Sequence, residues 1–464
     1  MSSFSPWPPE ETIVALSTPP GRAGIAVIRI SGPDALACAR AVFRMRANAR
    51  IEPHRAVLGR FVGELDSSGL AEEIDTGYLT WHPEGLSFTG QEIAELSCHS
   101  SPPVIERLLA ALLAAGAKAA GPGEFTYRAV LSGRLDLVQA EGIRDLIDAE
   151  TSAAARLARE RIRGDLSRRL GAIGEELVEV ISRAEASLEF AEEPDASGAG
   201  DALPEQIRTL ERQVRSFVAS YRRGRLMRDG ATVALAGRVN AGKSSLFNRL
   251  LGAERAIVSE QPGTTRDFVS EKVDLDGFAV TFIDTAGLSD RAAGIESEGV
   301  RRSEDWIGRA DLVVVLVASD RQPDAADRRL LDSCAGRSLA VASKSDLSPS
   351  AGCASPRNGT LFLPVSARTG RGVDELRSEI RRTLCGGGAP SMNEVLITDA
   401  RHHEALRRCG ARLTRAVEAL SSGATEEIAL VDLYAALNHL GEITGAVTQD
   451  DIYARIFSTF CIGK

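Results

Sequence analysis

Residues 237 to 244 read Gly-Arg-Val-Asn-Ala-Gly-Lys-Ser, the pattern of a phosphate-binding P-loop. The apolar run Thr232–Ala236 before it predicts a buried strand, and Ser245–Leu251 after it predicts a helix. Glycines in such a loop let backbone N–H groups turn toward phosphate oxygens, and the helix N-terminus adds its dipole. Lys243 is expected to reach the outer phosphates, and Ser244 to hold a Mg²⁺ ion. The stretch therefore predicts a nucleotide-binding strand–loop–helix unit.

The composition is that of a globular chain, with 464 residues, 44% hydrophobic and 26% charged. This length favours about three domains. We find no apolar run of the ~18 residues that a membrane helix needs, and no signal peptide. Seven cysteines without a Cys-x-x-Cys pair favour free thiols in a reducing cytosol over a zinc site. Because the net charge is −9, bulk attraction does not hold RNA, and any nucleic-acid contact must be local or shared with a partner.

The first part of the chain mixes short strands and helices, and the middle is helical. We expect a strand at Gly24–Ile30 and an Ala/Leu-rich helix at Val104–Ala120. Residues 125–223 then show helical spacing of apolar side chains, interrupted by a loop at Pro194–Pro204. Helical spacing returns over residues 395–457.

Between these helical stretches, strands and helices alternate. The expected strands are Thr232–Gly237, Glu271–Leu275, Ala279–Asp284, Leu312–Ala318, Ser338–Ala342 and Leu361–Val365. The turn Asp276-Gly277 predicts a hairpin, and the other connections predict crossover helices. The fold class is therefore α/β plus α. We predict an N-terminal α/β domain over residues 1–120, a helical domain over 121–226 and 386–464, and an inserted P-loop domain with a mixed, mostly parallel sheet over 227–385.

Two motifs after the P-loop are suited to a γ-phosphate and its Mg²⁺ ion. Gly263-Thr-Thr-Arg-Asp267 lies in a loop, where Thr265 offers a hydroxyl and Gly263 or Thr264 a backbone N–H. Asp284-Thr-Ala-Gly287 ends a hydrophobic strand. Asp284 would hold Mg²⁺ through water, and the Gly287 N–H would meet the γ-phosphate. Such sheets bind ligands at the carboxyl ends of their strands, where these motifs are expected.

Two later motifs select the base. Asp346, in Ser343-Lys-Ser-Asp346, can accept from the ring N–H and the exocyclic amine of guanine, which adenine does not supply. Ser366-Ala-Arg368 follows the last strand and can close over the base. The whole pattern resembles the small G-protein superfamily and predicts GTP. Ser343 stands where that superfamily has an Asn that tethers the P-loop, and its shorter hydroxyl predicts a weaker hold.

Hydrolysis is expected to differ from that of Ras-like enzymes, which place a Gln after Asp-x-x-Gly to orient water. Here that residue is Leu288, which cannot polarise water. The next segment offers Asp290, Glu296 and Glu298, each of which could equally be a solvated carboxylate. Asn240 in the P-loop could coordinate a monovalent cation that neutralises charge as an arginine finger does, or it could be an ordinary polar loop residue.

Motifs from end to end of the chain go beyond a generic GTPase. They are Thr12-Ile-Val-Ala, Thr18-Pro-Pro-Gly-Arg-Ala-Gly, Ser87-Phe-Thr-Gly, Pro122-Gly-Glu-Phe-Thr, Leu135-Asp-Leu-Val-Gln-Ala-Glu, Asn240-Ala-Gly-Lys-Ser-Ser and the terminal Phe457-Ser-Thr-Phe-Cys-Ile-Gly-Lys. In this order they resemble the MnmE (TrmE) family of tRNA modification GTPases over essentially the whole chain.

The resemblance implies a cytoplasmic homodimer with an N-terminal folate-binding and dimerisation domain, a helical domain and an inserted G domain. It implies a heterotetramer with an FAD-containing partner, MnmG (GidA), with FAD on the partner only. Together the two proteins would install an aminomethyl or carboxymethylaminomethyl group at C5 of the wobble uridine of certain tRNAs. The one-carbon donor would be 5-formyltetrahydrofolate or a related tetrahydrofolate. GTP hydrolysis would need Mg²⁺ and be stimulated by K⁺. No membrane contact is implied.

The resemblance carries over residue by residue. The expected GTP contacts are Asn240, Ala241, Gly242, Lys243, Ser244, Ser245, Ser259, Gly263, Thr264, Thr265, Asp284, Thr285, Ala286, Gly287, Lys344, Asp346, Ser366, Ala367 and Arg368. The Mg²⁺ ligands would be Ser244 and Thr265, and the K⁺ ligands Asn240, Ser259, Gln261 and Thr264. Folate would contact Arg29, Glu95, Arg134 and Lys464.

Two catalytic assignments follow from the same resemblance. Glu296 matches the water-orienting glutamate, and Cys461 would act near the folate, with a nucleophile as one possibility and a small buried hydrophobe as the alternative. Arg134 keeps the charge of the Lys expected there but changes its geometry.

Two other functions compete with the leading one. A GTP-dependent ribosome-assembly factor would need an RNA-binding module after the G domain, where we find only helices. A non-enzymatic folate-binding scaffold with a degenerate nucleotide switch has Ser343 as its support. The arginine clusters at Arg156–Arg169, Arg222–Arg225 and Arg401–Arg415 are interpreted as solvated helix faces, with tRNA contact as the alternative.

Overall fold

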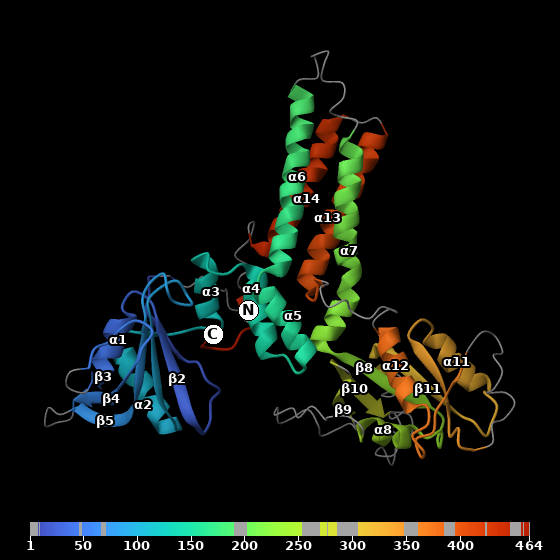
Figure 1. Cartoon of the computed structure of the whole chain (residues 1–464), viewed down its shortest axis with the longest axis horizontal. Helices are drawn as coiled ribbons and strands as arrows, with labels where there is room; N and C mark the ends of the chain where they lie inside the picture. Colours follow the sequence, from blue (N-terminus) through green and yellow to red (C-terminus); the bar gives the residue numbers. More distant parts are fainter. Residues whose placement is uncertain are drawn as a thin grey trace. The chain divides into compact units, whose positions relative to one another are not determined.

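The computed structural model describes residues 8, 10–45, 49–65, 71–189, 202–252, 270–275, 277–284, 305–347, 361–384, 395–422, 425–445, 456–457 and 459–463. They belong to two compact units (Figure 1), one of residues 1–144 with 441–464 and one of residues 145–440.

The first unit is built on a seven-stranded sheet of order β3-β4-β5-β6-β2-β1-β7. Its strands are β1 (Ile13–Leu16), β2 (Ala23–Ser31), β3 (Phe43–Met45), β4 (Ala56–Leu65), β5 (Ala71–His82), β6 (Ile93–Ser100) and β7 (Lys118–Ala119). All neighbours are antiparallel except β1 and β7. The expected strand at Gly24–Ile30 is confirmed as β2.

Two helices cover one face of this sheet, α1 (Ala35–Val42) and α2 (Pro102–Ala114). Alternate residues of β2, Ala26, Ile28 and Ile30, are fully buried against them. Because side chains alternate along a strand, Arg29 points to the opposite face. There α3 (Glu124–Leu131) contributes Phe125 to a small core with the first strand.

The second unit contains the long helices. They are α5 (Ser152–Ile162), α6 (Asp165–Glu189), α7 (Leu203–Asp229), α13 (Ala400–Ser421) and α14 (Glu426–Thr444), and α4 (Leu137–Ile147) precedes them. In Figure 1 the last four run side by side, and α7 contacts both α6 and α13. Buried α7 residues recur every three or four positions, as a helix with one apolar stripe requires.

A six-stranded sheet is inserted between α7 and α13, with order β13-β12-β11-β8-β10-β9. The strands are β8 (Ala231–Gly237), β9 (Ser270–Leu275), β10 (Phe278–Asp284), β11 (Leu312–Ala318), β12 (Ser338–Ser343) and β13 (Leu363–Pro364). Only β9 is antiparallel to its neighbour, through the expected hairpin with β10. The fold class predicted from the sequence is therefore confirmed.

Helices lie on both faces of this sheet. The helices α8 (Lys243–Leu251) and α12 (Val373–Leu384) pack with the larger core, and α11 (Ala325–Ser333) packs with the smaller one. The three central strands, β8, β10 and β11, are mostly buried and apolar, as expected for a parallel sheet covered on both sides. This places the carboxyl ends of β8, β10, β11 and β12 at one edge.

Three sequence-based boundaries were wrong. The helix expected to reach Ala120 ends at Ala114, because Gly116 has a φ of +103° and residues 118–119 pair with β1. Of the strand expected at Leu361–Val365, only Leu363–Pro364 forms a strand, the edge strand β13, because Pro364 has no N–H to donate to the ladder. Pro204 lies in the first turn of α7 rather than in a loop, a position that proline tolerates.

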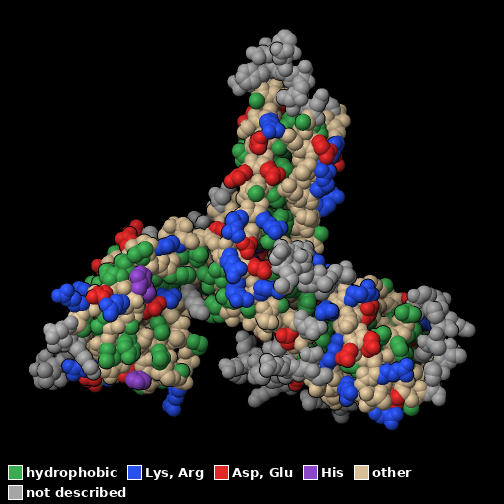
Figure 2. Space-filling view, in the orientation of Figure 1, with side chains coloured by type: hydrophobic (Ala, Val, Ile, Leu, Met, Phe, Trp, Pro, Cys, Tyr) green, Lys and Arg blue, Asp and Glu red, His purple; other side chains and the backbone are tan. Residues whose placement is uncertain are grey.

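Acidic and basic side chains are interspersed on the helices in Figure 2, with no large surface of one sign on that face. Within helices, arginines pair with carboxylates one turn away, as in Arg407 and Arg408 with Glu404. No helix among the described residues is long and apolar enough to cross a membrane.

Candidate functional site

The P-loop turns back on itself through residues with positive φ. Asn240 has a φ of +63° and Gly242 a φ of +89°, so the backbone reverses before α8 begins at Lys243. Gly237 must be a glycine, because a Cβ there would lie 2.5 Å from the carbonyl oxygen of Leu316. The Lys243 Nζ donates to the carbonyl oxygens of Gly237 and Arg238, each at 2.8 Å. The Lys243 side chain therefore folds back onto the P-loop, where it is expected to bind phosphate.

The first turn of α8 presents hydroxyls and backbone N–H groups at the same edge. Ser244 and Ser245 are exposed there, and the first N–H groups of a helix have no partner within the helix. Asp284, only 3% exposed, ends β10 and pairs in register with Leu235 of β8. A carboxylate, a hydroxyl and a helix N-terminus at one sheet edge suit a phosphate with a hard cation.

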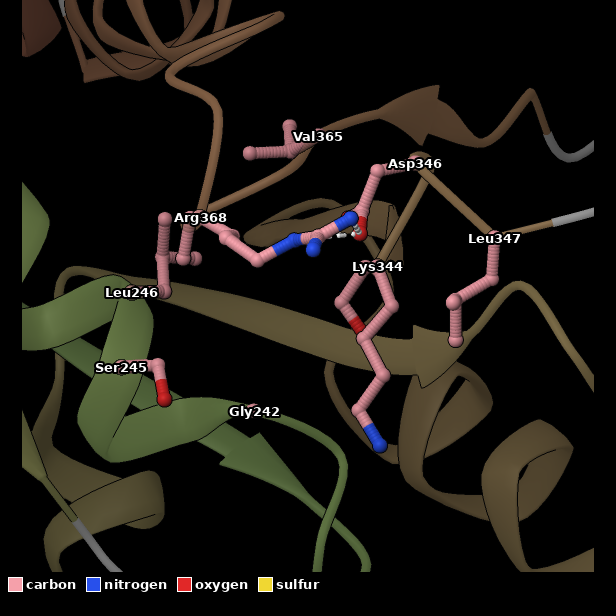
Figure 3. Close-up of a pocket in the computed structure, with 10 residues that line it drawn as sticks. Gly242, Ser245, Leu246, Lys344, Asp346, Leu347, Val365 and Arg368 are labelled. Carbon is pink, nitrogen blue, oxygen red and sulfur yellow. Dashed lines mark hydrogen bonds and ion pairs between the residues drawn. The ribbon is translucent and has the colours of Figure 1, made fainter.

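A cavity of about 360 Å³ lies beside the P-loop (Figure 3). It is lined by Gly242, Ser245, Leu246, Ser343, Lys344, Asp346, Leu347, Val365, Ala367 and Arg368. Leu246 of α8 and Val365 after β13 contribute apolar side chains, and Asp346 contributes a carboxylate. Small-molecule sites are usually lined by such a mixture of apolar side chains and a few polar groups. The cavity joins the P-loop to the residues that were expected to select a base.

Both oxygens of Asp346 are held. Its Oδ1 accepts from Ser366 Oγ at 2.6 Å, and its Oδ2 accepts from Arg368 at 2.9 Å from Nε and 2.6 Å from Nη2. The hydrogen bond from Ser366, followed by the Arg368 guanidinium, lowers the pKa of Asp346. The group is therefore an ionised acceptor at neutral pH, as the recognition of two N–H donors requires.

The Ser343 hydroxyl reaches the P-loop. Its Oγ donates to the carbonyl oxygen of Ala241 at 2.6 Å and is buried. Ser319 Oγ in turn donates to the Ser343 carbonyl oxygen at 2.7 Å. The serine therefore contacts the P-loop directly, and the weaker hold expected from its short side chain stays a prediction.

Several predicted residues lie outside the described residues. They are Ser259, Gln261, Gly263, Thr264, Thr265, Thr285, Ala286, Gly287, Leu288, Glu296 and Lys464. The Mg²⁺, K⁺ and water-orienting assignments that depend on them stay predictions. Asn240 and Ser244 are described and exposed at the P-loop, as those assignments need.

A second polar pair lies on the open face of the N-terminal sheet. Arg29 and Glu95 are directly paired across β2 and β6, with the Arg29 Nε and Nη2 at 2.9 and 2.8 Å from Glu95 Oε1. The guanidinium lies 5.8 Å from the Phe88 ring and 5.9 Å from the Phe125 ring. A forked cation, a carboxylate and two aromatic rings would suit a flat, hydrogen-bonding ligand.

The structure brings two further predicted residues to this unit. Arg134 donates to the Gly85 carbonyl oxygen of the loop that carries Phe88, and Ser132 donates to Thr89 of the same loop at 2.8 Å. Ser31 of β2 bonds to Thr89 at 2.8 Å, so the loop is held from both sides. Arg134 thus stabilises the loop whose Phe88 ring lies near Arg29. The two arginines do not contact each other among the interactions of the described residues.

The C-terminal tail docks on the N-terminal unit. The Cys461 carbonyl oxygen accepts from Gly123 N–H at 3.3 Å, and the Gly463 carbonyl oxygen accepts from Ser17 Oγ at 2.9 Å. Gly463 has a φ of +93°, and a Cβ there would lie 2.2 Å from the Leu16 carbonyl oxygen. The Cys461 side chain is exposed, so the alternative of a buried hydrophobe is wrong.

Sequence reasoning missed residues whose type gave no signal. Leu246, Leu347 and Val365 line the cavity but read as ordinary core positions. Phe88 and Phe125 belong to sequence motifs, but nothing in those motifs indicates that their rings lie next to Arg29. Among the residues that the structure describes, no group of three His, Cys, Asp or Glu side chains is arranged to hold a metal ion.

Comparison with known proteins covers the chain from end to end. Residues 12–134 match a family model described as the GTP-binding protein TrmE N-terminus, and residues 137–461 match one described as the MnmE helical domain. The tRNA modification GTPase MnmE of Geobacter sulfurreducens is 40% identical, covering 98% of this chain and 99% of its own. That of Pseudomonas aeruginosa PAO1 is 41% identical with the same coverage.

Solved structures add a partial likeness. The G domain of the T. maritima FeoB iron transporter is 26% identical and covers 33% of this chain and 98% of its own length, with a TM-score of 0.25. The full-length relatives, in contrast, match both units of the chain.

Proposed function

The chain belongs to the MnmE family of tRNA modification GTPases, and we propose that it hydrolyses GTP to drive the modification of the wobble uridine of certain tRNAs. The observation that carries the proposal is the cavity that joins the P-loop to an ionised Asp346. A scaffold with a degenerate switch does not need that arrangement. The hydrogen bond from Ser343 to the P-loop supports a functional nucleotide site over such a scaffold.

Guanine is the base that the cavity fits. The Asp346 carboxylate would accept from the ring N–H and the exocyclic amine, and Ser366 orients it by donating to Oδ1. Arg368 holds Oδ2 and would swing over the base plane to make room. Adenine has an acceptor where guanine has its ring N–H, so it would meet the carboxylate with a repulsive contact.

The phosphates would lie along the P-loop. Lys243 would exchange its two carbonyl partners for phosphate oxygens, and the first N–H groups of α8 would donate to them. Ser244 and Thr265 would hold Mg²⁺, with Asp284 behind it through water. The ion neutralises the charge that develops on the leaving phosphates.

Hydrolysis needs a group other than Leu288 to orient water. We assign this to Glu296, whose carboxylate would accept from the attacking water. Asn240, Ser259, Gln261 and Thr264 would hold K⁺, which supplies positive charge where an arginine finger acts in other GTPases.

The Arg29–Glu95 pair would take the tetrahydrofolate, for example 5-formyltetrahydrofolate. Glu95 would accept from the pterin amino and ring N–H groups, Phe88 and Phe125 would flank the ring, and Arg134 and Lys464 would meet the glutamate tail. Cys461 would act beside it on the docked tail, where its thiol is exposed.

We propose the remaining family properties for this chain as well. It would form a cytoplasmic homodimer and a heterotetramer with the FAD-dependent MnmG (GidA) protein, and together they would install the aminomethyl or carboxymethylaminomethyl group. The domain boundaries of the sequence analysis are proposed with them.

Mass spectrometry of tRNA nucleosides tests the function directly. A strain lacking this gene should lose the modified wobble uridines, the wild-type gene should restore them, and a Lys243→Ala gene should not. Unchanged wobble uridines in the deletion strain would end the proposal, and a ribosome-assembly defect with intact uridines would favour the assembly factor.

A further inference from the structure

Two histidines adjoin the Arg29–Glu95 pair. His82 ends β5, and its Nε2 lies 3.9 Å from Glu95 Oε2. Its other ring nitrogen, Nδ1, lies 2.9 Å from Nδ1 of His54, with ring centroids 5.0 Å apart. Histidine side chains reach the surface of this unit in Figure 2, and His54 is exposed while His82 is only 25% exposed.

The backbone fixes the two rings in this position. The His54 N–H donates to the Trp81 carbonyl oxygen at 2.8 Å, and Pro53 bridges to Trp81. His54 has a φ of +58°, a conformation that a residue with a side chain rarely adopts. The backbone of His54 is therefore held next to the residue that precedes His82.

Two nitrogens that face each other at hydrogen-bond distance share one proton. One Nδ1 donates and the other accepts, so both rings cannot be imidazolium ions without two N–H groups meeting. A second proton must break the contact between His54 and His82. The ring that is freed in this way and already faces a carboxylate is His82.

The groups around His82 act on its charge in opposite directions. Burial lowers the pKa of His82 below its ordinary value of 6.5, and His54 and Arg29 lower it further, while Glu95 raises it. Glu52 and Arg55, the charged neighbours of His54 in the chain, form an exposed ion pair with each other. His82 is therefore neutral at pH 7 and takes up a proton only in mild acid.

Glu95 divides its two oxygens between different neighbours. Arg29 holds Oε1 through two nitrogens, and Oε2 faces His82 at a distance too long for a hydrogen bond. Oε2 is thus the oxygen available to a ligand donor while His82 is neutral. A protonated His82 would need to move by about 1 Å to bond to it.

We propose that His82 is a pH-sensing positioning residue for Glu95. As a neutral ring it leaves Oε2 to accept from the N–H groups of a bound tetrahydrofolate, and as an imidazolium it pairs with Oε2 and excludes the ligand. This inference rests on the proposed folate site. Its sign is fixed: binding favours neutral His82, so affinity falls as the pH drops through the pKa of His82.

The test is the binding of 5-formyltetrahydrofolate to the full-length protein, measured by calorimetry from pH 7.5 to pH 5. For the wild type we expect the affinity to fall by up to about tenfold per pH unit below the pKa of His82. In the His82→Gln variant a polar side chain without a titrating nitrogen lies next to Glu95. The ratio of its folate affinities at pH 7.5 and pH 5 should approach one.

His99→Gln is the matched control. This histidine is 71% exposed on β6, and its ring pairs with Asp75 at 2.8 Å rather than with Glu95. Its profile should follow the wild type. Thermal unfolding of each variant at both pH values separates loss of binding from loss of fold.

The outcomes separate the inference from the function beneath it. Wild-type protein that binds no folate at pH 7.5 overturns both. Binding at pH 7.5 with the same pH profile in wild type and His82→Gln overturns only the role of His82. A flat His82→Gln profile beside a steep wild-type and His99→Gln profile supports it.

Discussion

At the scale of single residues, one hydroxyl joins the two halves of the nucleotide site. Ser343 Oγ links the end of β12, three residues before Asp346, to the Ala241 carbonyl oxygen in the P-loop. The bond is short and buried, so its loss would leave a carbonyl oxygen without this donor. The position of the P-loop relative to Asp346 then depends on this contact.

We therefore expect Ser343→Ala to weaken GTP binding by about fivefold, the equivalent of one net hydrogen bond of ~1 kcal/mol. Fluorescent-nucleotide titration measures this. Ser345→Ala is the control, because the Ser345 Oγ is buried but has no hydrogen-bond partner among the described residues. Equal losses in the two variants would show that the tether is not what matters.

Asp346 determines the base. Replacing it with Asn turns one acceptor oxygen into an amide donor, which repels the guanine amino group but matches the carbonyl of xanthine. Asp346→Asn should lose GTP turnover by about tenfold or more and recover it with xanthosine triphosphate, since a hydrogen bond to a charged group contributes ~1.5–3 kcal/mol. Phosphate release with both nucleotides tests this, and undiminished GTP turnover would contradict the assignment.

The lowered pKa of Asp346 gives a pH prediction. A carboxylate whose pKa lies below its ordinary 3.8 remains ionised as the pH falls from 7 to 5. Its contribution to guanine recognition is lost only at still lower pH. The preference for GTP over ATP should therefore be constant across pH 5–7, and a preference that declines in that window would contradict it.

At the scale of elements, α7 makes a close backbone contact with the segment before α13, a few residues before it leads into the inserted sheet. Gly224 of α7 packs against the backbone at Ile397, where a Cβ would lie 2.1 Å from the carbonyl oxygen. The helix then ends at Gly230, which has a φ of +82°, and β8 begins one residue later. The P-loop strand is thus anchored directly to the helical core.

Gly224→Ala should lower the free energy of unfolding by about 1–3 kcal/mol, because the backbone at residue 397 must shift. Gly174→Ala on α6 is the matched control, since nothing lies within 4 Å of its added Cβ. It should raise stability by about 1 kcal/mol through helix propensity. Urea unfolding followed by circular dichroism compares them, and two equal shifts would contradict the packing.

At the scale of the whole molecule, the sequence predicted the fold class better than it predicted where individual elements end. The P-loop, the alternating strands and the helical stretches gave the fold class, because glycine spacing and apolar periodicity are local signals. The end of α2 was wrong, because a parallel pairing with β1 stops the helix, and that strand lies far away in the sequence.

The candidate sites divide in the same way. Asp346 and Lys243 were predicted because each belongs to a spaced motif. Ser343 was placed at the tethering position, but its direct bond to Ala241 was not predicted, and neither was the His54–His82 contact, since both depend on distances between segments that sequence spacing does not report. Chemistry carried by a motif is visible in a sequence, whereas chemistry made by tertiary contact is not.

The central claim is that this chain is a GTPase whose P-loop uses K⁺. The most direct measurement is steady-state GTP turnover by the full-length protein in KCl and in NaCl at equal ionic strength, with wild type and Asn240→Ala. The account predicts faster turnover in KCl for the wild type and loss of that stimulation in Asn240→Ala. Equal rates in the two salts for the wild type would contradict it.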